Sequence, residues 1–137
     1  MNISSRCEYA CRAMVELARN EHAEVPLTAS EIAERRSIPE KYLVHILLQL
    51  KHSGLIRSVR GPQGGYFLAK QPEEISLFHI VEAIDGKVLD PRPVDDANGR
   101  DLEKTWREVA EHIEGVLDKV SLREILERAA EGSMYYI

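Results

Sequence analysis

One stretch, residues 54–66 with the sequence GLIRSVRGPQGGY, constrains the fold of this chain most strongly. Residues 55–60 alternate apolar and polar side chains, and residues 66–69 can pair with them as a second strand. Pro62 fixes the entry to the intervening turn, and two consecutive glycines permit backbone angles that other residues avoid. The stretch therefore predicts a short β-hairpin, directly after a helix that ends at Gly54.

The predicted hairpin is basic and compact. Arg57 and Arg60 bring positive charge to a small, rigid loop, which a minor groove or a phosphate backbone can accept. An ordinary surface hairpin is the alternative interpretation of the same residues. The candidate DNA contacts of this hairpin are Arg57, Arg60, Gly61, Gln63, Gly64, Gly65 and Tyr66.

The residues before the hairpin predict a helix-turn-helix. Thr28 and Glu31 form a capping-box pattern that begins a short helix. Pro39 suits the first position of the next helix, because its missing N–H would lack a partner there in any case. The apolar residues of this second helix recur at helical spacing and are Leu43, Ile46, Leu47 and Leu50. A helix-turn-helix followed by a hairpin is the pattern of a winged helix.

In a helix-turn-helix, the second helix enters the major groove with its N-terminal residues at the base edges. Residues off the apolar stripe, including His52, would face outward. The candidate DNA contacts of this unit are Thr28, Ser37, Pro39, Lys41, Tyr42, Val44 and His45.

Charge is distributed unevenly along the chain, whose net charge is −5 at pH 7. Residues 1–34 hold three Arg against six Glu, residues 35–70 hold seven Lys or Arg against one Glu, and residues 71–137 hold eight basic against sixteen acidic residues. The basic segment is thus the predicted helix-turn-helix and hairpin. This sorting favours DNA binding over another class, a winged-helix module that binds protein, and a steep fall of affinity with salt would identify DNA binding.

The remaining pattern is helical, so the predicted fold class is mainly α with a small β-hairpin. A first helix is expected over residues 5–20, and a short helix begins after Ser76. The expected organisation is a winged helix-turn-helix domain over residues 1–86, a Pro- and Asp-rich connecting loop over residues 87–100, and a dimerisation helix with a tail over residues 101–137.

The long helix carries apolar residues at alternating steps of four and three, which is a heptad seam. These residues are Leu102, Trp106, Val109, Ile113, Val116 and Val120. A helix of about 19 residues reaches roughly 28 Å, too far to bury its whole length on so small a domain. The seam therefore predicts a homodimer, and packing against the first helix of the same chain is the alternative.

Several other classes of protein fit this sequence poorly. No run reaches transmembrane length and the first residues lack the apolar core of a signal peptide, so we expect a cytoplasmic protein without a membrane partner. No nucleophile elbow, phosphate loop or HExxH motif is present, so no enzyme activity is expected. The two cysteines do not make a disulfide scaffold.

Cys7 and Cys11 lie four residues apart and share a face of the first helix. They could form a redox pair or part of a metal site, which would make the chain a redox- or metal-sensing regulator. A structural role is the favoured alternative, because cysteine is commonly a small core residue and four-apart cysteines on one helix are poorly placed to bridge each other. The histidines lack the spacing of metal ligands, so no metal site is predicted.

Two segments together, IPEKYL at residues 38–43 and RGPQGGY at residues 60–66, resemble the Rrf2 family of bacterial winged-helix regulators. The resemblance covers essentially the whole chain. It implies a dimeric, sequence-specific transcription regulator, with repression the expected mode, on a palindromic operator of duplex DNA, with Arg60 at the minor groove. Val44 and His45 depart from the Glu-Gln pair common in the family, so the operator sequence stays open.

Family members that bind iron–sulfur clusters carry three cysteines between the short helix and the long helix. Residues 86–106 contain none here, so no cluster or other cofactor is expected, and the resemblance points to the cluster-free branch that controls cysteine metabolism. The last residues, Tyr135, Tyr136 and Ile137, resemble a tail that enters the active site of cysteine synthase, a candidate partner. Packing of this tail on the dimerisation arm is the alternative.

Overall fold

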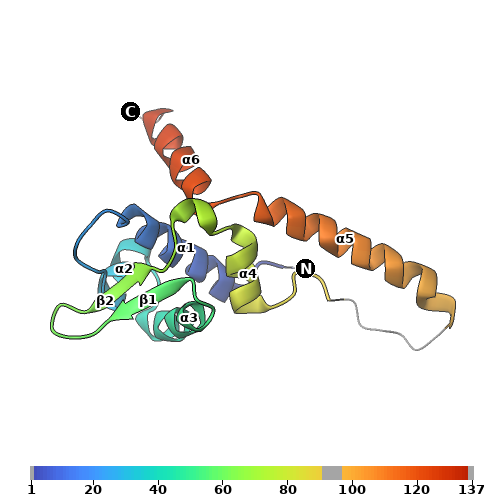
Figure 1. Ribbon diagram of the computed structural model, residues 1–137, viewed down its shortest axis with the longest axis horizontal. Helices are drawn as coiled ribbons and strands as arrows, with labels where there is room; N and C mark the ends of the chain where they lie inside the picture. Colours follow the sequence, from blue (N-terminus) through green and yellow to red (C-terminus); the bar gives the residue numbers. More distant parts are fainter. Residues whose placement is uncertain (1, 91–96, 136–137) are drawn as a thin grey trace.

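The computed structural model describes residues 2–90 and 97–135, and its elements follow the order expected of a winged helix with a long C-terminal arm (Figure 1). The fold is mainly α with one two-stranded antiparallel hairpin, as predicted. The elements are α1 (Ser5–Arg19), α2 (Ala29–Arg36), α3 (Glu40–His52), β1 (Ile56–Val59), β2 (Gly65–Leu68), η1 (Pro72–Glu74), α4 (Leu77–Asp85), η2 (Ala97–Gly99), α5 (Arg100–Asp118) and α6 (Leu122–Tyr135).

A single apolar core holds the winged-helix body together. Helix α1 contacts α2, α3, α4 and α6, so it forms the centre around which the other helices pack. Each fully buried Leu or Ile contributes about 1.5–3 kcal/mol relative to an exposed side chain. The apolar stripe predicted for α3 is confirmed, since all four of its residues are fully buried; the largest core side chains of α1–α4 are Met14, Leu17, Ile32, Leu43, Ile46, Leu47, Leu50 and Ile80.

The helix-turn-helix has well-defined ends. The Thr28 hydroxyl accepts a 3.1 Å hydrogen bond from the backbone N–H of Glu31, as its predicted N-cap role requires. Ser37 ends α2 in the left-handed region, with φ of 53°. Pro39 corrects the sequence prediction by one residue: it is the N-cap of α3, with extended φ of −60° and ψ of 120°, and its carbonyl accepts from the N–H of Leu43. Its fixed φ serves this position as well as the next.

The predicted hairpin forms, with Arg57 opposite Phe67 and Val59 opposite Gly65, so its second strand begins one residue earlier than expected. A third segment holds the second strand, because Leu27 exchanges two backbone hydrogen bonds with Tyr66, of 3.2 and 2.8 Å. The hairpin is therefore tied to Leu27, the residue before the N-cap of α2.

The long arm leaves the body at a short backbone ladder. Leu77 N–H donates to Val120 C=O, and Leu122 N–H donates to Ile75 C=O, both at 2.9 Å. Val120 is thus a correction to the predicted seam: α5 ends at Asp118, and Val120 lies in the link to α6, where its carbonyl is used by this ladder. Figure 1 shows α5 projecting from the body while α6 runs in another direction.

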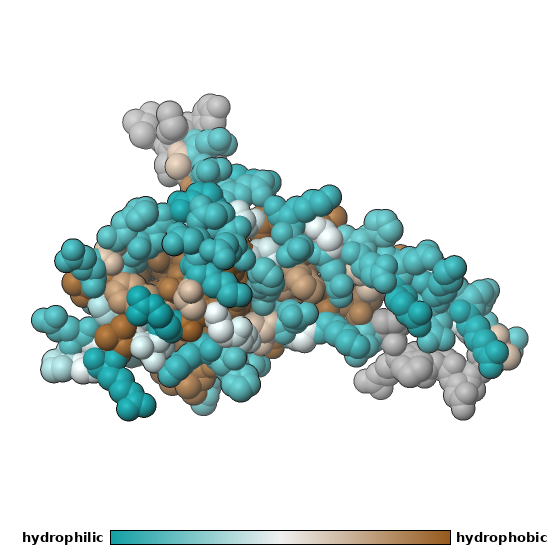
Figure 2. All heavy atoms as spheres, in the orientation of Figure 1, coloured by the Kyte–Doolittle hydropathy of each residue, from teal (hydrophilic) through white to brown (hydrophobic). Residues whose placement is uncertain are grey.

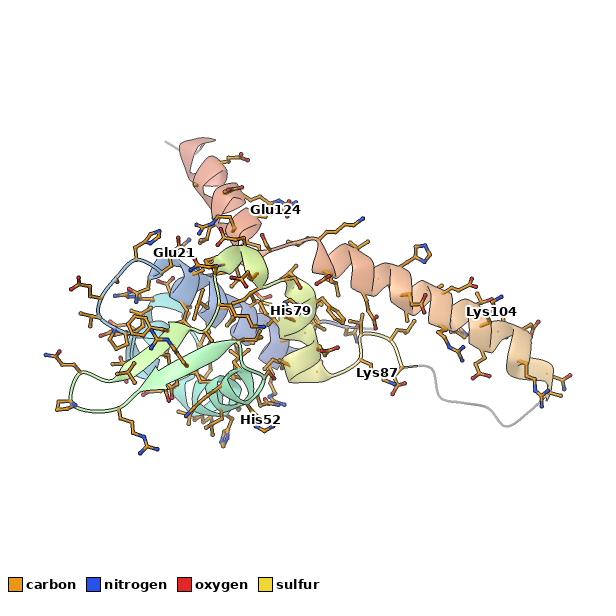
Figure 3. The ribbon with its side chains drawn as sticks, viewed as in Figure 1. Glu21, His52, His79, Lys87, Lys104 and Glu124 are labelled. Atoms are coloured by element: carbon orange, nitrogen blue, oxygen red, sulfur yellow. The ribbon has the colours of Figure 1, made fainter. Side chains whose placement is uncertain are left out.

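Side chains reinforce this joint. Ser76 Oγ donates a 2.8 Å hydrogen bond to Asp118, and the same hydroxyl accepts from the backbone N–H of His79. The His79 ring accepts from the Ser76 N–H through Nδ1, completing a reciprocal cap at the start of α4. Figure 3 shows His79 beside the joint. None of the helices in residues 2–90 and 97–135 combines the length and apolarity of a membrane crossing.

Candidate nucleic-acid interface

Helix α3 presents exposed side chains on successive turns. Its N-terminal half exposes Lys41, Tyr42, Val44 and His45, and its C-terminal half exposes Leu48, Lys51 and His52. Figure 3 shows His52 projecting from the lower end of this helix into solvent. Because Leu43, Ile46, Leu47 and Leu50 fill the opposite face, helical geometry forces these residues outward.

Polar contacts hold α3 in its orientation. Ser30 Oγ donates a 2.8 Å hydrogen bond to the Glu40 carboxylate, which joins the start of α3 to α2. At the other end of the helix, Arg6 Nη2 of α1 donates to the Gln49 side-chain oxygen. The Lys41 ammonium lies 5.1 Å from the centroid of the Tyr42 ring, so two predicted contact residues pack on each other.

The two arginines of the hairpin, which we call the wing, lie in different environments. The Arg57 guanidinium lies 4.6 Å from the centroid of the Phe67 ring and shares a hollow with Glu21 and Glu24 at the end of α1. Arg60 is exposed beside the turn, next to the exposed residues Gly61 and Gln63. Of the two arginines, Arg60 is the one presented by the wing tip.

The paired glycines of the wing have a steric role. A Cβ atom on Gly64 would lie 2.4 Å from the carbonyl oxygen of Val59, and one on Gly65 would lie 2.5 Å from that of Leu27. Neither position accepts a side chain without a shift of backbone. Gly64, Gly65 and the half-buried Tyr66 therefore shape the wing, whereas Gly61 and Gln63 lie on its surface.

Two residues of the predicted basic segment, Arg35 and Arg36, form ion pairs within the chain. The Glu16 carboxylate of α1 is only 6% exposed and lies 3.6 Å from Arg35, 3.8 Å from Arg36 and 3.3 Å from Arg19. This cluster locks α2 onto α1 through opposite charges. The positive charge available for a polyanion is thus smaller than the segment count implied.

The arm exposes an apolar face. Of the predicted seam, Leu102, Trp106, Val109 and Val116 are exposed, with Trp106 at 48% and Val116 at 65%. Helix α5 contacts α4 through a neighbouring stripe that includes Ala110 and Leu117, so the predicted alternative of packing along α1 is not what the structure has. Ile113 is half-buried between the two stripes. The exposed stripe has no cover within the described chain.

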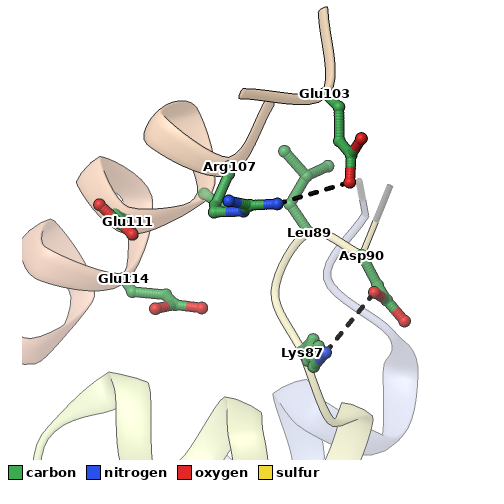
Figure 4. A pocket seen from close by; sticks show the side chains of 8 residues that line it. Lys87, Leu89, Asp90, Glu103, Arg107, Glu111 and Glu114 are labelled. Carbon is green, nitrogen blue, oxygen red and sulfur yellow. Dashed lines mark hydrogen bonds and ion pairs between the residues drawn. The ribbon is translucent and has the colours of Figure 1, made fainter. Parts of the chain in front are cut away.

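A pocket lies between residues 103–114 of α5 and the loop after α4, and Figure 4 shows its charged lining. Arg107 pairs with Glu103 at 3.4 Å, and Lys87 pairs with Asp90 at 3.8 Å. Residues 91–96 of the predicted connection lie outside the described residues. Arg107 and Glu103 are one turn apart on α5 and stabilise that helix, whereas Lys87 and Asp90 pair within the loop after α4.

The two cysteines pack together on α1, with Cys7 buried and Cys11 half-buried, both as free thiols. The Cys11 thiol donates a hydrogen bond to Cys7, which lowers the pKa of Cys7 and raises the pKa of Cys11. Burial acts against the lowering of the Cys7 pKa and adds to the raising of the Cys11 pKa. Within residues 2–90 and 97–135, no three His, Cys, Asp or Glu side chains are arranged to hold a metal ion. Iron–sulfur clusters are held chiefly by cysteine thiolates, and the two cysteines of the sequence both lie on α1.

Comparison with known proteins decides the family. A model of the Rrf2 family, described as iron-dependent transcriptional regulators, matches residues 3–128. The chain belongs to the Rrf2 family. It is therefore a winged-helix transcriptional regulator of a DNA-binding class, and the motif resemblance seen in the sequence is confirmed.

Individual relatives agree with this assignment. The regulator CymR of Bacillus subtilis is 29% identical to this chain over the full length of both proteins. The solved structure of CymR, described as the global cysteine regulator of that organism, superposes with a TM-score of 0.79. That superposition covers 93% of this chain and 98% of CymR, at 26% identity. The structure of T. potens IscR gives a TM-score of 0.76 at 33% identity, over 99% and 97% of the two chains. An rrf2-like regulator of Rhodobacter capsulatus is 41% identical over 88 residues, which span 63% of this chain and 59% of that protein. These relatives are named as regulators, in keeping with the expectation that the chain is not an enzyme.

Sequence reasoning did not single out Leu48, Arg6 or Gln49. Leu48 is 57% exposed on the face of α3 that carries Val44, and four-residue spacing from Val44 was the signal that could have found it. The Arg6–Gln49 contact joins positions 43 residues apart, which no local pattern records.

Proposed function

We propose that this protein is a homodimeric, cytoplasmic repressor that binds a palindromic operator through α3 and the wing. The observation that carries the proposal is the exposed outer face of α3, anchored by Glu40 and Gln49, in a chain whose family consists of DNA-binding regulators. In this arrangement α3 lies in the major groove and Arg60 reaches the adjacent minor groove. The proposed contacts of α3 are Lys41, Tyr42, Val44 and His45, with Ser37 and Pro39 near the backbone.

The dimer supplies the two-fold symmetry that a palindrome requires. The exposed stripe of α5 contains three large apolar residues and a tryptophan, and aromatic residues are typical of interface centres. A second copy related by a two-fold axis would cover the same stripe on both chains. Each chain would then present one α3 to one half-site.

One experiment tests this proposal as a whole. Duplexes selected from a random pool by the purified protein are expected to share an inverted repeat, and affinity is expected to fall linearly with the logarithm of salt concentration. A protein-binding module would select no common sequence. Transcription in vitro from a promoter carrying the selected repeat should fall on addition of the protein; an increase would assign activation instead of repression.

The proposal includes no resident iron–sulfur cluster. The chain has two cysteines, both on α1, and none between residues 86 and 106. Protein purified under anaerobic conditions is expected to lack acid-labile sulfide and visible charge-transfer absorption. Stoichiometric sulfide in that preparation would contradict the proposal.

Regulation of cysteine metabolism rests on the likeness to CymR, whose solved structure is described as that of a global cysteine regulator. The candidate partner is cysteine synthase, bound through the C-terminal residues. Tyr135 is the last residue of α6, and Tyr136 and Ile137 lie outside the described residues. Calorimetry of cysteine synthase against the full chain and a variant lacking Ile137 tests this, and equal binding by both would remove the tail from the mechanism.

A further inference from the structure

The outer face of α3 is apolar at its centre, which is unusual for a helix that enters a charged groove. Val44 is 44% exposed and Leu48 is 57% exposed, and the two lie one turn apart on the same side of the helix. Lys41, His45 and His52 flank this pair. Figure 2 shows apolar surface on the underside of the body, where α3 lies.

Packing within the chain does not account for this apolar pair. The core of the winged helix uses Leu43, Ile46, Leu47 and Leu50, on the opposite side of α3, and those four are fully buried. Leu48 instead lines a shallow surface hollow with Arg6, Tyr42 and His45. A partner must therefore cover the pair if its exposure is to be relieved.

The chemistry of the major groove offers one apolar group at the base edges, the C5 methyl of thymine. Residues four apart on a helix are displaced by about 6 Å along its axis, and successive bases on one strand are about 3.4 Å apart. Val44 and Leu48 can thus reach methyl groups about two base steps apart. The flanking Lys41 and the histidines have the charge or hydrogen-bonding groups that suit phosphates and base edges.

We propose that Val44 and Leu48 read thymine methyl groups in each operator half-site. This inference rests on the proposed function, because it assigns a base preference to the helix already placed in the major groove. The apolar pair favours A·T base pairs at the operator positions that α3 contacts. Cytosine at those positions would place a polar amino group against Val44 and Leu48.

The test removes single methyl groups from the DNA. In the inverted repeat selected by the protein, each thymine is replaced in turn by deoxyuridine, which keeps its pairing and loses only the methyl. We expect a loss of about fourfold per contacted methyl at one or two positions per half-site and no change elsewhere, the factor being that of one buried methylene. Replacement by 5-bromodeoxyuridine, whose bromine is similar in size to a methyl, should restore affinity.

Variants assign each methyl to a side chain. In each of Leu48→Ala and Val44→Ala, replacing thymine by deoxyuridine should no longer reduce operator affinity at one position, and should still reduce it at the other. Combining each variant with each replacement forms a double-mutant cycle. Both residues are exposed, so the variants keep the core intact. Ile3→Ala is the matched control, because Ile3 is equally exposed at 63% but lies before α1. It should keep the full deoxyuridine pattern.

The outcomes separate this inference from the function on which it rests. Uniform indifference to deoxyuridine, or a pattern unchanged in both alanine variants, overturns methyl reading while operator binding stands. Absence of any selected sequence overturns operator binding itself. A change of oligomeric state in Leu48→Ala, measured by sedimentation without DNA, also overturns the inference, because a second copy of the chain would then cover this face.

Discussion

Arg123 and Glu21 are 102 residues apart in the sequence, and Nη2 of Arg123 donates hydrogen bonds of 2.8 and 3.0 Å to the two carboxylate oxygens of Glu21. Nε of the same guanidinium lies 3.3 Å from Glu73 in η1. One arginine therefore fastens the start of α6 to the end of α1 and to η1. Figure 3 labels Glu21 after α1 and Glu124 on α6, the two segments that this contact joins.

Arg123→Gln is expected to loosen α6 from the body and leave α1–α4 folded. Amide hydrogen exchange should become faster in α6 and stay slow in α3. Arg128→Gln is the control, because Arg128 pairs with Glu124 one turn away on the same helix and its side chain is 64% exposed. Glu73 gives a pH signature: the fold lowers its pKa, through backbone and Arg123 hydrogen bonds, so its contribution is complete above the ordinary value of 4.5. That contribution is lost as pH falls through the lower folded value, and Glu73→Gln should remove this pH dependence.

Glu16→Gln is expected to destabilise the fold by about 1–3 kcal/mol, since it leaves three guanidinium groups around a neutral amide. This figure is below the roughly 3–5 kcal/mol typical of a fully buried pair, because the arginines are partly exposed. Urea unfolding measures the change. Glu8→Gln on the same helix should change stability by less than about 0.5 kcal/mol, because its pair with Arg12 is at the surface. Equal effects of both substitutions would contradict the clustered arrangement.

Gly64→Ala is expected to distort the wing, because its Cβ would meet the Val59 and Gly61 carbonyl oxygens at 2.4 and 2.9 Å. Thermal unfolding should shift to lower temperature and operator affinity should fall. Gly115→Ala in α5 is the opposite case: nothing lies within 4 Å of its Cβ, so the helix should gain about 0.5–1 kcal/mol. A tolerant Gly64 would mean that the turn can adopt another backbone path.

Arg60→Ala should weaken operator binding by about 1–3 kcal/mol if the side chain lies in the minor groove. Titration at several salt concentrations separates a groove contact from a general loss of charge. Arg57→Ala should have a smaller effect on affinity, because its guanidinium stacks on Phe67. Arg128→Ala, far along α6, is the neutral control. An Arg60 variant with unchanged affinity would remove the wing tip from recognition.

Trp106→Asp combined with Val116→Asp should produce monomers, since both side chains lie on the exposed apolar stripe and outside the contact with α4. Sedimentation gives the oligomeric state, and operator affinity should drop by about 10²–10⁴ when two half-sites are no longer engaged together. Lys104→Asp on the same helix should remain dimeric. Unmodified protein that sediments as a monomer at micromolar concentration would contradict the proposed dimer.

Local patterns predicted most of the fold and part of the candidate interface. The hairpin, the Thr28 cap and the buried stripe of α3 each follow from residues close together in the sequence, where periodicity and turn chemistry decide the conformation. The helix limits at Pro39 and Val120 were each misjudged, because they depend on cap geometry and on a backbone ladder to a distant segment.

The number of basic residues in a segment likewise does not show which of them are free to bind DNA. Arg35 and Arg36 count as basic residues in the sequence, but Glu16, some twenty residues earlier, is their partner in the fold. The environment of Arg57 could not be predicted either, because it depends on Phe67 across the hairpin. Tertiary pairing, rather than composition, decides which charges remain available.

The two-residue ladder between residues 75–77 and 120–122 has a consequence for operator geometry. It joins the root of α5 to the start of α4, and only eight residues separate the start of α4 from the end of β2. In a dimer built on α5, the angle at this joint sets how far apart and at what rotation the two copies of α3 stand. Because half-sites recur at the helical repeat of 10–10.5 base pairs, substitutions at Ser76 or Ser121 are expected to change the preferred spacer length and leave the half-site letters unchanged.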